Sequence, residues 1–566
     1  RINLRSYQKE LVRRVKDRTR SIVVLPTGTG KTFIAAEVIY ERLKKMEDKI
    51  SIFLCTTNPL RMQQENELRE YISSQHDYDK NIRVASLVSE ATNQHALENT
   101  NNALYVMTAG GFDNVVATEK LLNHIDLIVL DEIHHLECNN KKHPYNKIVK
   151  TWHDVDLLGL TATPAASITD NSTRKRFESL LKSFHTDDDG FLQVIEEKED
   201  LNKFCNKTEF TTQPVVMDPA DKDCIKLLEE FIRDLEMDLE DNISFKLAFP
   251  DEKDVYGYQV KVTAMAKTVL EKMKGHQKAM LYRSQLIFLS YLSEGLSLVK
   301  NLGHKYAREH ISRRGRSSIL TDGSNDSKEF LDKVESLLLG LESAQNANPE
   351  CQHPKFMEMK KTILSYTAQA EEHRCKVLVF AETRRVVMEL SCRINSDPDF
   401  ISNNICCDFL LGSSSKSHPG RPNGLQMSQD KQLQKLENFK YGKVDVLVAT
   451  TIAEEGIDIT KCNLVIQYDV SPSGKCLQQR AGRARALNSV VHSIYFADAC
   501  KKFDETKALH KSEVEQDRMN NEIQERAKPD RGTTRLRAEL TEAERKKHKK
   551  TLEKQKKGER EISPTK

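Results

Sequence analysis

The sequence predicts an α/β protein: two domains on mostly parallel sheets, an all-helical segment between them, and a charged helical tail. Two separate sets of short apolar runs, helix-length segments between the runs, and a long charged stretch of helical periodicity support this prediction. At 566 residues the chain is too long for a single hydrophobic core, because domains usually contain about 100 to 200 residues. We therefore expect three or four domains.

The first α/β domain is predicted over residues 1–200. Its apolar runs have strand length and alternate with helical stretches, a pattern typical of buried parallel strands covered by helices on both faces. The runs are Ser21–Leu25, Ser51–Cys55, Leu104–Met107, Asp126–Leu130 and Leu157–Leu160. Residues 201–218 are predicted as a linker or as the start of the second α/β domain.

A helical block is predicted over residues 219–372, with one apolar face that includes Leu228, Ile232 and Leu235. The second α/β domain follows over residues 373–498, again from apolar runs that alternate with helix-length segments. The runs are Lys376–Phe380, Val444–Val448, Asn463–Gln467 and His492–Phe496. Residues 499–566 are predicted to be helical and highly charged, either as a solvated or frayed tail or as an RNA contact.

Composition excludes several classes of protein. Charged residues make up 30% of the chain, and no apolar run approaches the roughly 20 residues of a membrane helix, so no membrane span is expected. The twelve cysteines form no C-x2-C pair, which predicts reduced thiols in a cytoplasmic protein and no zinc within the chain. A net charge of only +3 means that any nucleic-acid surface must be local. The start at Arg1 suggests a piece of a longer protein.

A phosphate-binding loop is predicted at residues 25–32, Leu-Pro-Thr-Gly-Thr-Gly-Lys-Thr, between an apolar strand and a helix start. Gly28, Thr29 and Gly30 would let backbone N–H groups wrap the phosphates of ATP, with the helix N-terminus adding positive potential. Lys31 would reach the terminal phosphates, and Thr32 would bring its hydroxyl to Mg²⁺.

An acidic pair ends the apolar run at residues 126–130, where open α/β sheets place their ligands. Asp131 would hold Mg²⁺ and Glu132 would orient and deprotonate the attacking water; the alternative is a pair that caps the next helix. His134 and the hydroxyls of Thr161 and Thr163 would couple this site to a nucleic-acid groove, unless residues 161–163 form a simple loop.

The second α/β domain supplies the other half of this site. Gln479, Arg483 and Arg485 surround a glycine turn, and an inserted arginine stabilises the charge that develops on a transferred phosphoryl group. An arginine cluster without the phosphate loop would more often be a solvated face. Gly456 and Asp458 would face ATP and its ribose. Because the site is complete only when both domains close, ATP and nucleic-acid binding should be coupled.

These motifs resemble the RIG-I-like receptor and Dicer branch of the superfamily 2 helicases over nearly the whole chain. The resemblance rests on residues 131–135 (Asp-Glu-Ile-His-His) followed by 143–146 (His-Pro-Tyr-Asn), on 449–459 (Ala-Thr-Thr-Ile-Ala-Glu-Glu-Gly-Ile-Asp-Ile), and on 479–485. Leu25 replaces the first glycine of the general phosphate-loop pattern, which is ordinary in superfamily 2.

The resemblance implies two RecA-like motor domains, an all-helical insertion domain in the second, and a C-terminal helical pincer. It implies a double-stranded-RNA-dependent ATPase that clamps the duplex, in antiviral sensing or in RNA interference. Arg5 and Gln8 match the adenine-binding positions, although an amphipathic helix start is the plain alternative. The matching RNA-contact positions are Thr56, Thr57, Gln63, Thr108, Lys141, Thr383, Arg384, Thr450, Thr451 and Glu455.

Departures and alternatives accompany this resemblance. Glu382 stands where some receptors have a basic residue, and Ser413 stands where an arginine follows the corresponding glycine. Residues 256–261 resemble an RNA-probing helix but equally fit core packing. Dicer or a signalling adaptor would bind through regions outside this chain. A Hef-like DNA translocase and an RNA-binding scaffold with a weak motor are the competing functions.

Overall fold

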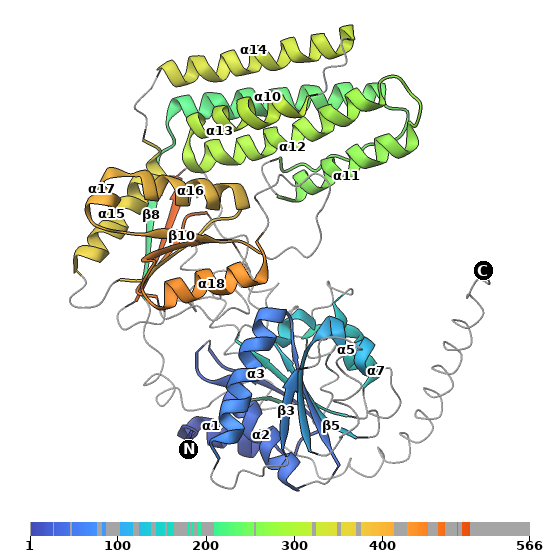
Figure 1. The fold of residues 1–566 in the computed structure, drawn as a ribbon, viewed down its shortest axis with the longest axis vertical. Helices are drawn as coiled ribbons and strands as arrows, with labels where there is room; N and C mark the ends of the chain where they lie inside the picture. The colour runs from blue at the N-terminus through green and yellow to red at the C-terminus, as the bar shows by residue number, and fades with distance from the viewer. Residues whose placement is uncertain are drawn as a thin grey trace.

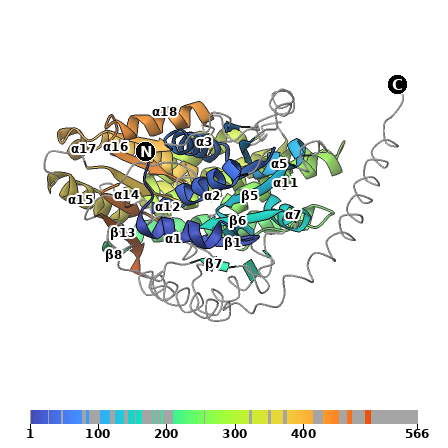
Figure 2. The same cartoon turned by 90° about the horizontal axis from the view of Figure 1, so that it is seen from below.

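A computed structural model describes residues 2–26, 28–45, 48–75, 82–86, 102–116, 124–136, 143–152, 155–162, 179–180, 184, 191–193, 209–253, 256–319, 324–347, 352–369, 375–412, 427–450, 462–469, 484 and 489–497. The predicted tail from residue 499 onward and Ser413 lie outside these residues. Figures 1 and 2 show the fold from two directions.

The first sheet has seven strands in the order β3-β4-β2-β5-β6-β1-β7, and every neighbouring pair is parallel. Its strands are β1 (Arg20–Val24), β2 (Ile50–Cys55), β3 (Arg83–Ser86), β4 (Ala103–Thr108), β5 (Ile125–Asp131), β6 (Asp156–Thr161) and β7 (Phe191–Gln193). Each of the five apolar runs predicted for this domain forms a strand. The two strands that were not predicted, β3 and β7, are the edges of the sheet.

Helices cover both faces of this sheet because successive side chains of a buried strand point in opposite directions. In β2, Ile52 and Leu54 belong to one apolar core, and Phe53 and Cys55 belong to the other. The core of Phe53 and Cys55 is closed by α1 (Ser6–Val15), α2 (Lys31–Lys45) and α3 (Asn58–Ser73). The core of Ile52 and Leu54 is closed by α5 (Ala109–Val116), the 3-10 turn η1 (Ile133–Leu136) and α7 (Pro144–Thr151).

The second sheet has six parallel strands in the order β10-β11-β9-β12-β13-β8. These are β8 (Glu209–Val215), β9 (Val377–Phe380), β10 (Cys407–Leu410), β11 (Val446–Ala449), β12 (Leu464–Gln467) and β13 (Val490–Phe496). The helices α16 (Arg384–Ser396), α17 (Pro398–Ser402) and α18 (Gln429–Lys440) belong to the same domain. Again the strands that were not predicted, β8 and β10, are the two edges. The predicted architecture of two parallel-sheet α/β domains is confirmed.

The segment between β8 and β9 is helical. It contains α10 (Pro219–Asn242), α11 (Tyr256–Lys272), α12 (Ala279–Leu302), α13 (His304–His310), the short turns η2 (Ile311–Gly315) and η3 (Arg316–Ser318), α14 (Asn325–Ala347) and α15 (Pro354–Gln369). Long helices α10, α12 and α14 run side by side beyond α16 in Figure 1, whereas α15 also packs on strands of the second sheet. Within the described residues, no helix combines the length and apolar character of a membrane span.

Candidate nucleotide site and nucleic-acid edge

The loop between β1 and α2 turns twice through left-handed backbone. Gly28 has φ of 82° and Gly30 has φ of 81°, a region that glycine enters without steric penalty. A Cβ atom at Gly30 would lie 2.5 Å from Nε2 of Gln8, so this position also lacks space for a side chain. The Thr29 hydroxyl donates to the carbonyl of Pro26 over 2.7 Å. This tight glycine turn at a helix N-terminus fits the phosphates of a nucleotide.

The start of α1 holds this loop from the side. Nε2 of Gln8 donates to the Thr29 carbonyl over 2.9 Å, and the Tyr7 hydroxyl donates to the same carbonyl over 2.7 Å. Oε1 of Gln8 accepts the backbone N–H of Arg5 over 2.8 Å. Gln8 therefore links Arg5 to the loop, and any contact of these two residues with adenine would be transmitted directly to the phosphate cradle.

Lys31 is the first residue of α2, and its ammonium turns back over the loop. Nζ lies 3.1 Å from the carbonyl of Leu25 and 3.4 Å from that of Pro26. Thr32 follows in the first turn of the helix. The positive charge and the helix N-terminus thus meet at one end of the loop, as anion binding requires.

Asp131 is the last residue of β5 and is buried. Burial, with the neighbouring charge of Glu132, raises the pKa of Asp131 to about 7, and the positive charge of Lys31 opposes this shift. Its Oδ1 accepts the N–H of Glu132 over 3.1 Å, and its Oδ2 accepts Nε2 of Gln64 over 3.3 Å. A divalent cation would neutralise the buried carboxyl group of Asp131 and its partly buried neighbour Glu132, so the site fits Mg²⁺.

Magnesium would have few protein ligands here. In the part of the chain that the structure describes, no three His, Cys, Asp or Glu side chains gather as a metal site. Mg²⁺ commonly keeps several waters and binds one or two protein oxygens together with substrate phosphates. Asp131 and Thr32 remain the predicted protein groups for such an ion.

A polar chain leads from the acidic pair to the end of β6. Nδ1 of His134 lies 3.3 Å from Oε2 of Glu132 and 2.9 Å from the Thr161 hydroxyl. Glu132 itself has φ of 52°, an uncommon conformation for a residue with a side chain, and this strain is typical of functional sites. The structure therefore brings together Glu132, His134 and Thr161, three of the predicted catalytic and coupling residues.

Tyr145 anchors the backbone of the acidic pair through its hydroxyl, a role that the sequence did not reveal. Its hydroxyl lies 2.7 Å from the carbonyl of Asp131 and 3.1 Å from that of Leu54, and the side chain is fully buried. Gln64 is a second supporting residue that was not predicted. Tyr145 lies in the 143–146 segment that carries the family resemblance, and Gln64 lies in no such motif. For neither does the local sequence indicate the contact with Asp131, because the partners lie on other elements.

The predicted RNA-contact residues of the first domain follow the carboxyl ends of its strands. Thr56 and Thr57 follow β2, and Thr108 ends β4, directly across from the last residue of β2. The Thr57 hydroxyl accepts the N–H of Leu60 over 3.4 Å and so caps α3. Gln63 lies one turn further along α3, where its amide donates to Glu67. These residues therefore lie on the same side of the sheet as the acidic pair, beyond the carboxyl ends of its strands.

In the second domain, Thr383 and Arg384 follow β9, and Thr450 follows β11. Thr383 is buried, and its hydroxyl accepts the N–H of Val386 over 3.3 Å, which makes it the N-cap of α16. Thr383 therefore has an internal partner besides any RNA phosphate. The remaining predicted site residues, Lys141, Thr163, Thr451, Glu455, Gly456, Asp458, Gln479, Arg483 and Arg485, lie outside the described residues.

A buried polar junction at the end of β12 was also not predicted. Nζ of Lys355 lies 2.9 Å from Oδ1 of Asn301 and 3.4 Å from Oδ1 of Asp469. Oδ2 of Asp469 accepts the N–H of Glu382 over 2.7 Å, and the Tyr468 hydroxyl donates to the Asn301 carbonyl over 2.6 Å. This junction ties α12 and α15 to the strand ends of the second sheet.

In the predicted RNA-probing segment, Tyr258 is fully buried, and its hydroxyl donates to Oε1 of Glu236 over 2.6 Å, so this residue packs in the helical core. Val260 and Lys261 are exposed on the same helix.

Comparisons with known proteins agree with this geometry. Residues 1–166 match the family model "Type III restriction enzyme, res subunit", and residues 355–487 match "Helicase conserved C-terminal domain". Dicer-like protein 2-2 of Aspergillus niger is 25% identical over 508 residues, 86% of this chain and 33% of that protein. ATP-dependent RNA helicase DHX58 of Mus musculus is 25% identical over 530 residues, 86% of this chain and 70% of that protein. These matches relate the chain to the Dicer and RIG-I-like branch of the superfamily 2 helicases.

This helicase shares its fold with a solved structure, the helicase domain of Pyrococcus furiosus Hef. The TM-score is 0.54 at 22% identity, covering 87% of this chain and 95% of that one. The chain spans about a third of the Aspergillus relative.

Proposed function

We propose that this helicase is a double-stranded-RNA-dependent ATPase that closes around the duplex as a clamp. One observation carries the proposal. The phosphate loop, the acidic pair, Thr56 and Thr108 all lie at the carboxyl ends of the parallel strands of the first sheet. Nucleotide chemistry and RNA contact at one edge give a direct physical basis for their coupling. The relatives named for Dicer and for RNA helicase activity support RNA as the partner.

For ATP hydrolysis, Lys31 would bind the terminal phosphates, and Asp131 with Thr32 would hold Mg²⁺, which supplies charge neutralisation. Glu132 would orient the attacking water and accept its proton, since it directly follows Asp131 and its carboxylate lies 3.3 Å from Nδ1 of His134. Gln479, Arg483 and Arg485 would complete the site from the second motor domain and stabilise the developing charge.

For RNA, the proposed contacts are hydroxyl, amide and basic groups at the strand ends of both motor domains. Such groups suit phosphate and sugar oxygens, and A-form duplexes are recognised mainly by their shape, backbone and 2′-hydroxyls. The insertion helices and a C-terminal pincer would complete the ring around the duplex. Binding without base contacts predicts stimulation by duplexes of unrelated sequence.

The ATPase rate tests this proposal. It would be measured without nucleic acid and with blunt duplex RNA, end-blocked duplex RNA, 5′-triphosphate duplex RNA, single-stranded RNA and duplex DNA. We expect strong stimulation by duplex RNA of any sequence. Stimulation by duplex DNA alone would support the second candidate, a Hef-like DNA translocase, whose fold this helicase shares. No turnover with any nucleic acid would support a scaffold with a weak motor.

We further propose that the protein acts in the cytoplasm, in antiviral RNA sensing or in RNA interference, with Dicer or a signalling adaptor bound through other regions of the native protein. Cells carrying Lys31→Ala in that protein would be given duplex RNA. Loss of small RNAs cut from the duplex would place it in RNA interference, and loss of antiviral transcripts would place it in sensing. If the variant cells show neither of these losses, both proposed roles are contradicted.

A further inference from the structure

Helix α12 belongs to two parts of the molecule at once. It packs against α10, α11 and α13 of the helical insertion and also against α16 of the second motor domain. A single apolar core continues from insertion residues such as Leu289 and Leu296 to motor residues such as Val379 and Leu390. The insertion and the second motor domain therefore share one packed interior, and α12 crosses between them.

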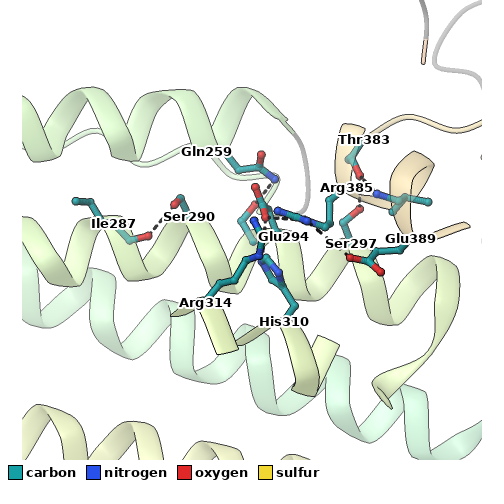
Figure 3. A network of polar contacts seen from close by, with 12 residues as sticks. Gln259, Ile287, Ser290, Glu294, Ser297, His310, Arg314, Thr383, Arg385 and Glu389 are labelled. Carbon is teal, nitrogen blue, oxygen red and sulfur yellow. Dashed lines mark hydrogen bonds and ion pairs between the residues drawn. The ribbon is translucent and has the colours of Figure 1, made fainter. Parts of the chain in front are cut away.

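A buried ion pair joins α12 to α16 within this interior (Figure 3). Nε of Arg385 lies 3.4 Å from Oε2 of Glu294, and Nη1 lies 3.7 Å from Oε1 of Glu389. Nε2 of His310 approaches the same Glu294 oxygen to 2.9 Å. Burial alone would raise the pKa of Glu294, but His310 and Arg385 hold it below its ordinary value, so Glu294 is a carboxylate that pairs with Arg385.

The ion pair fixes the beginning of α16. Two residues before Arg385, Thr383 caps this helix, and its hydroxyl lies 3.4 Å from the Ser297 hydroxyl of α12 (Figure 3). Glu294 and Ser297 are three residues apart and so lie on one face of α12. That face thus contacts both Thr383 and Arg385, whereas Arg384 projects in another direction, because successive residues of a helix are rotated by about 100°.

General stabilisation is a poor explanation for this pair. Buried ion pairs often contribute no more than apolar residues of similar volume would, because both charges lose their hydration. Arg385 is only 3% exposed, and among the described residues its Nη2 has no hydrogen-bond partner. The Arg385 guanidinium therefore loses its hydration without gaining a full set of hydrogen bonds. Such a cost is consistent with a pair that serves to orient α16 relative to α12.

We propose that Arg385 is a positioning residue: anchored to Glu294 of the insertion domain, it sets the start of α16 so that Arg384 meets the backbone of the bound duplex. This inference rests on the proposed RNA-dependent function. It gives the insertion domain a second role besides any contact of its own, because the orientation of α12 decides whether the second motor domain grips the duplex.

The test compares Arg385→Met and Glu294→Gln with the wild type and with Lys253→Met. Lys253 forms a matched ion pair, 2.6 Å from Glu236, within the insertion domain and away from α16. We would measure the ATPase rate as a function of duplex RNA and of ATP, and duplex affinity as a function of salt. For Arg385→Met we expect a roughly tenfold higher half-activating RNA concentration, the effect of one charge-assisted hydrogen bond, with unchanged ATP KM and unchanged rate without RNA.

Two further readouts separate positioning from mere stability. If Arg385 acts through Arg384, Arg385→Met should lower the salt slope of duplex binding by about one, as loss of one phosphate contact does. Arg384→Ala and the double variant should then have the same affinity as Arg385→Met within about twofold, because the two changes remove one interaction. Arg385→Lys should restore part of the affinity.

The wild type decides the proposed function, and the variants decide this inference. A wild type that duplex RNA does not activate overturns both. An activated wild type with Arg385→Met indistinguishable from Lys253→Met, or with additive losses from Arg384→Ala and Arg385→Met, overturns the positioning role alone. Should Arg385→Met fail to fold, Glu294→Gln, which keeps the side-chain volume, supplies the same comparisons, and an unchanged half-activating RNA concentration would then refute the inference.

Discussion

Replacing Tyr145 with phenylalanine removes one hydroxyl from beneath the acidic pair and leaves the ring in place. That hydroxyl lies between the carbonyls of Asp131 and Leu54, at 2.7 and 3.1 Å. It therefore joins the end of β5 to the end of β2, directly before Glu132. The substitution tests whether the acidic pair depends on this backbone anchor.

The expected loss of stability follows from the geometry. A hydroxyl has one proton, so Tyr145 donates to one carbonyl at a time, and its removal costs one net hydrogen bond. Because the site is fully buried, a carbonyl is left short of a partner, and the total cost is about 1 to 3 kcal/mol. A shift of Asp131 and Glu132 by a fraction of an ångström should also lower kcat by roughly tenfold, since about 1 Å can cost a hundredfold.

The only tryptophan of the chain offers a local probe of stability. Trp152 directly follows α7, the helix of Tyr145, and its ring centroid lies 5.5 Å from that of Phe112 in the first motor domain. Urea unfolding followed by Trp152 fluorescence should shift to lower urea by about 1 M in Tyr145→Phe. ATPase kinetics with saturating nucleic acid would supply kcat and KM.

Tyr71→Phe is the matched control, since it removes a buried tyrosine hydroxyl that donates to Glu37 over 2.8 Å between two helices of the same domain. We expect it to lower stability without the tenfold fall in kcat. Equal kcat values for Tyr145→Phe, Tyr71→Phe and the wild type would refute the anchoring role. An unchanged urea midpoint in Tyr145→Phe would refute the hydrogen bond itself.

Three other substitutions address the rest of the site. Lys31→Ala should abolish ATP turnover yet retain duplex binding, since the phosphate and RNA groups are separate; RNA-stimulated turnover in this variant, measured by phosphate release, would reject the assignment. Glu132→Gln should trap ATP and RNA together because the pocket stays intact without water activation, and weaker nucleotide binding by equilibrium titration would contradict that role. Lys355→Met should lower the free energy of unfolding by about 3 to 5 kcal/mol, because Asp469 would keep a buried charge without its cation; a thermal midpoint equal to that of the wild type would exclude this.

The first-domain half of the proposed nucleotide site could be predicted from the sequence because its parts are local. The phosphate loop depends on glycines and a lysine between one strand and the next helix, and Asp131 and Glu132 directly follow an apolar run. The supporting groups could not be predicted. Tyr145 lies 14 residues from Asp131, Gln64 lies 67 residues from it, and Glu294 lies 91 residues from Arg385. No spacing rule connects such pairs before the chain has folded.

The strands divide in the same way. Central strands such as β2 and β9 are buried throughout, so each appears in the sequence as a nearly continuous apolar run. Edge strands such as β8 are partly exposed and carry a mixed sequence, Glu-Phe-Thr-Thr-Gln-Pro-Val, that resembles a loop. By itself the sequence predicted the two sheets, the order of their motifs and the residues that we propose for nucleotide chemistry. Only the tertiary structure decided the edges of each sheet, the anchors beneath the acidic pair and the joining of α12 to α16, because these depend on contacts between residues distant in sequence.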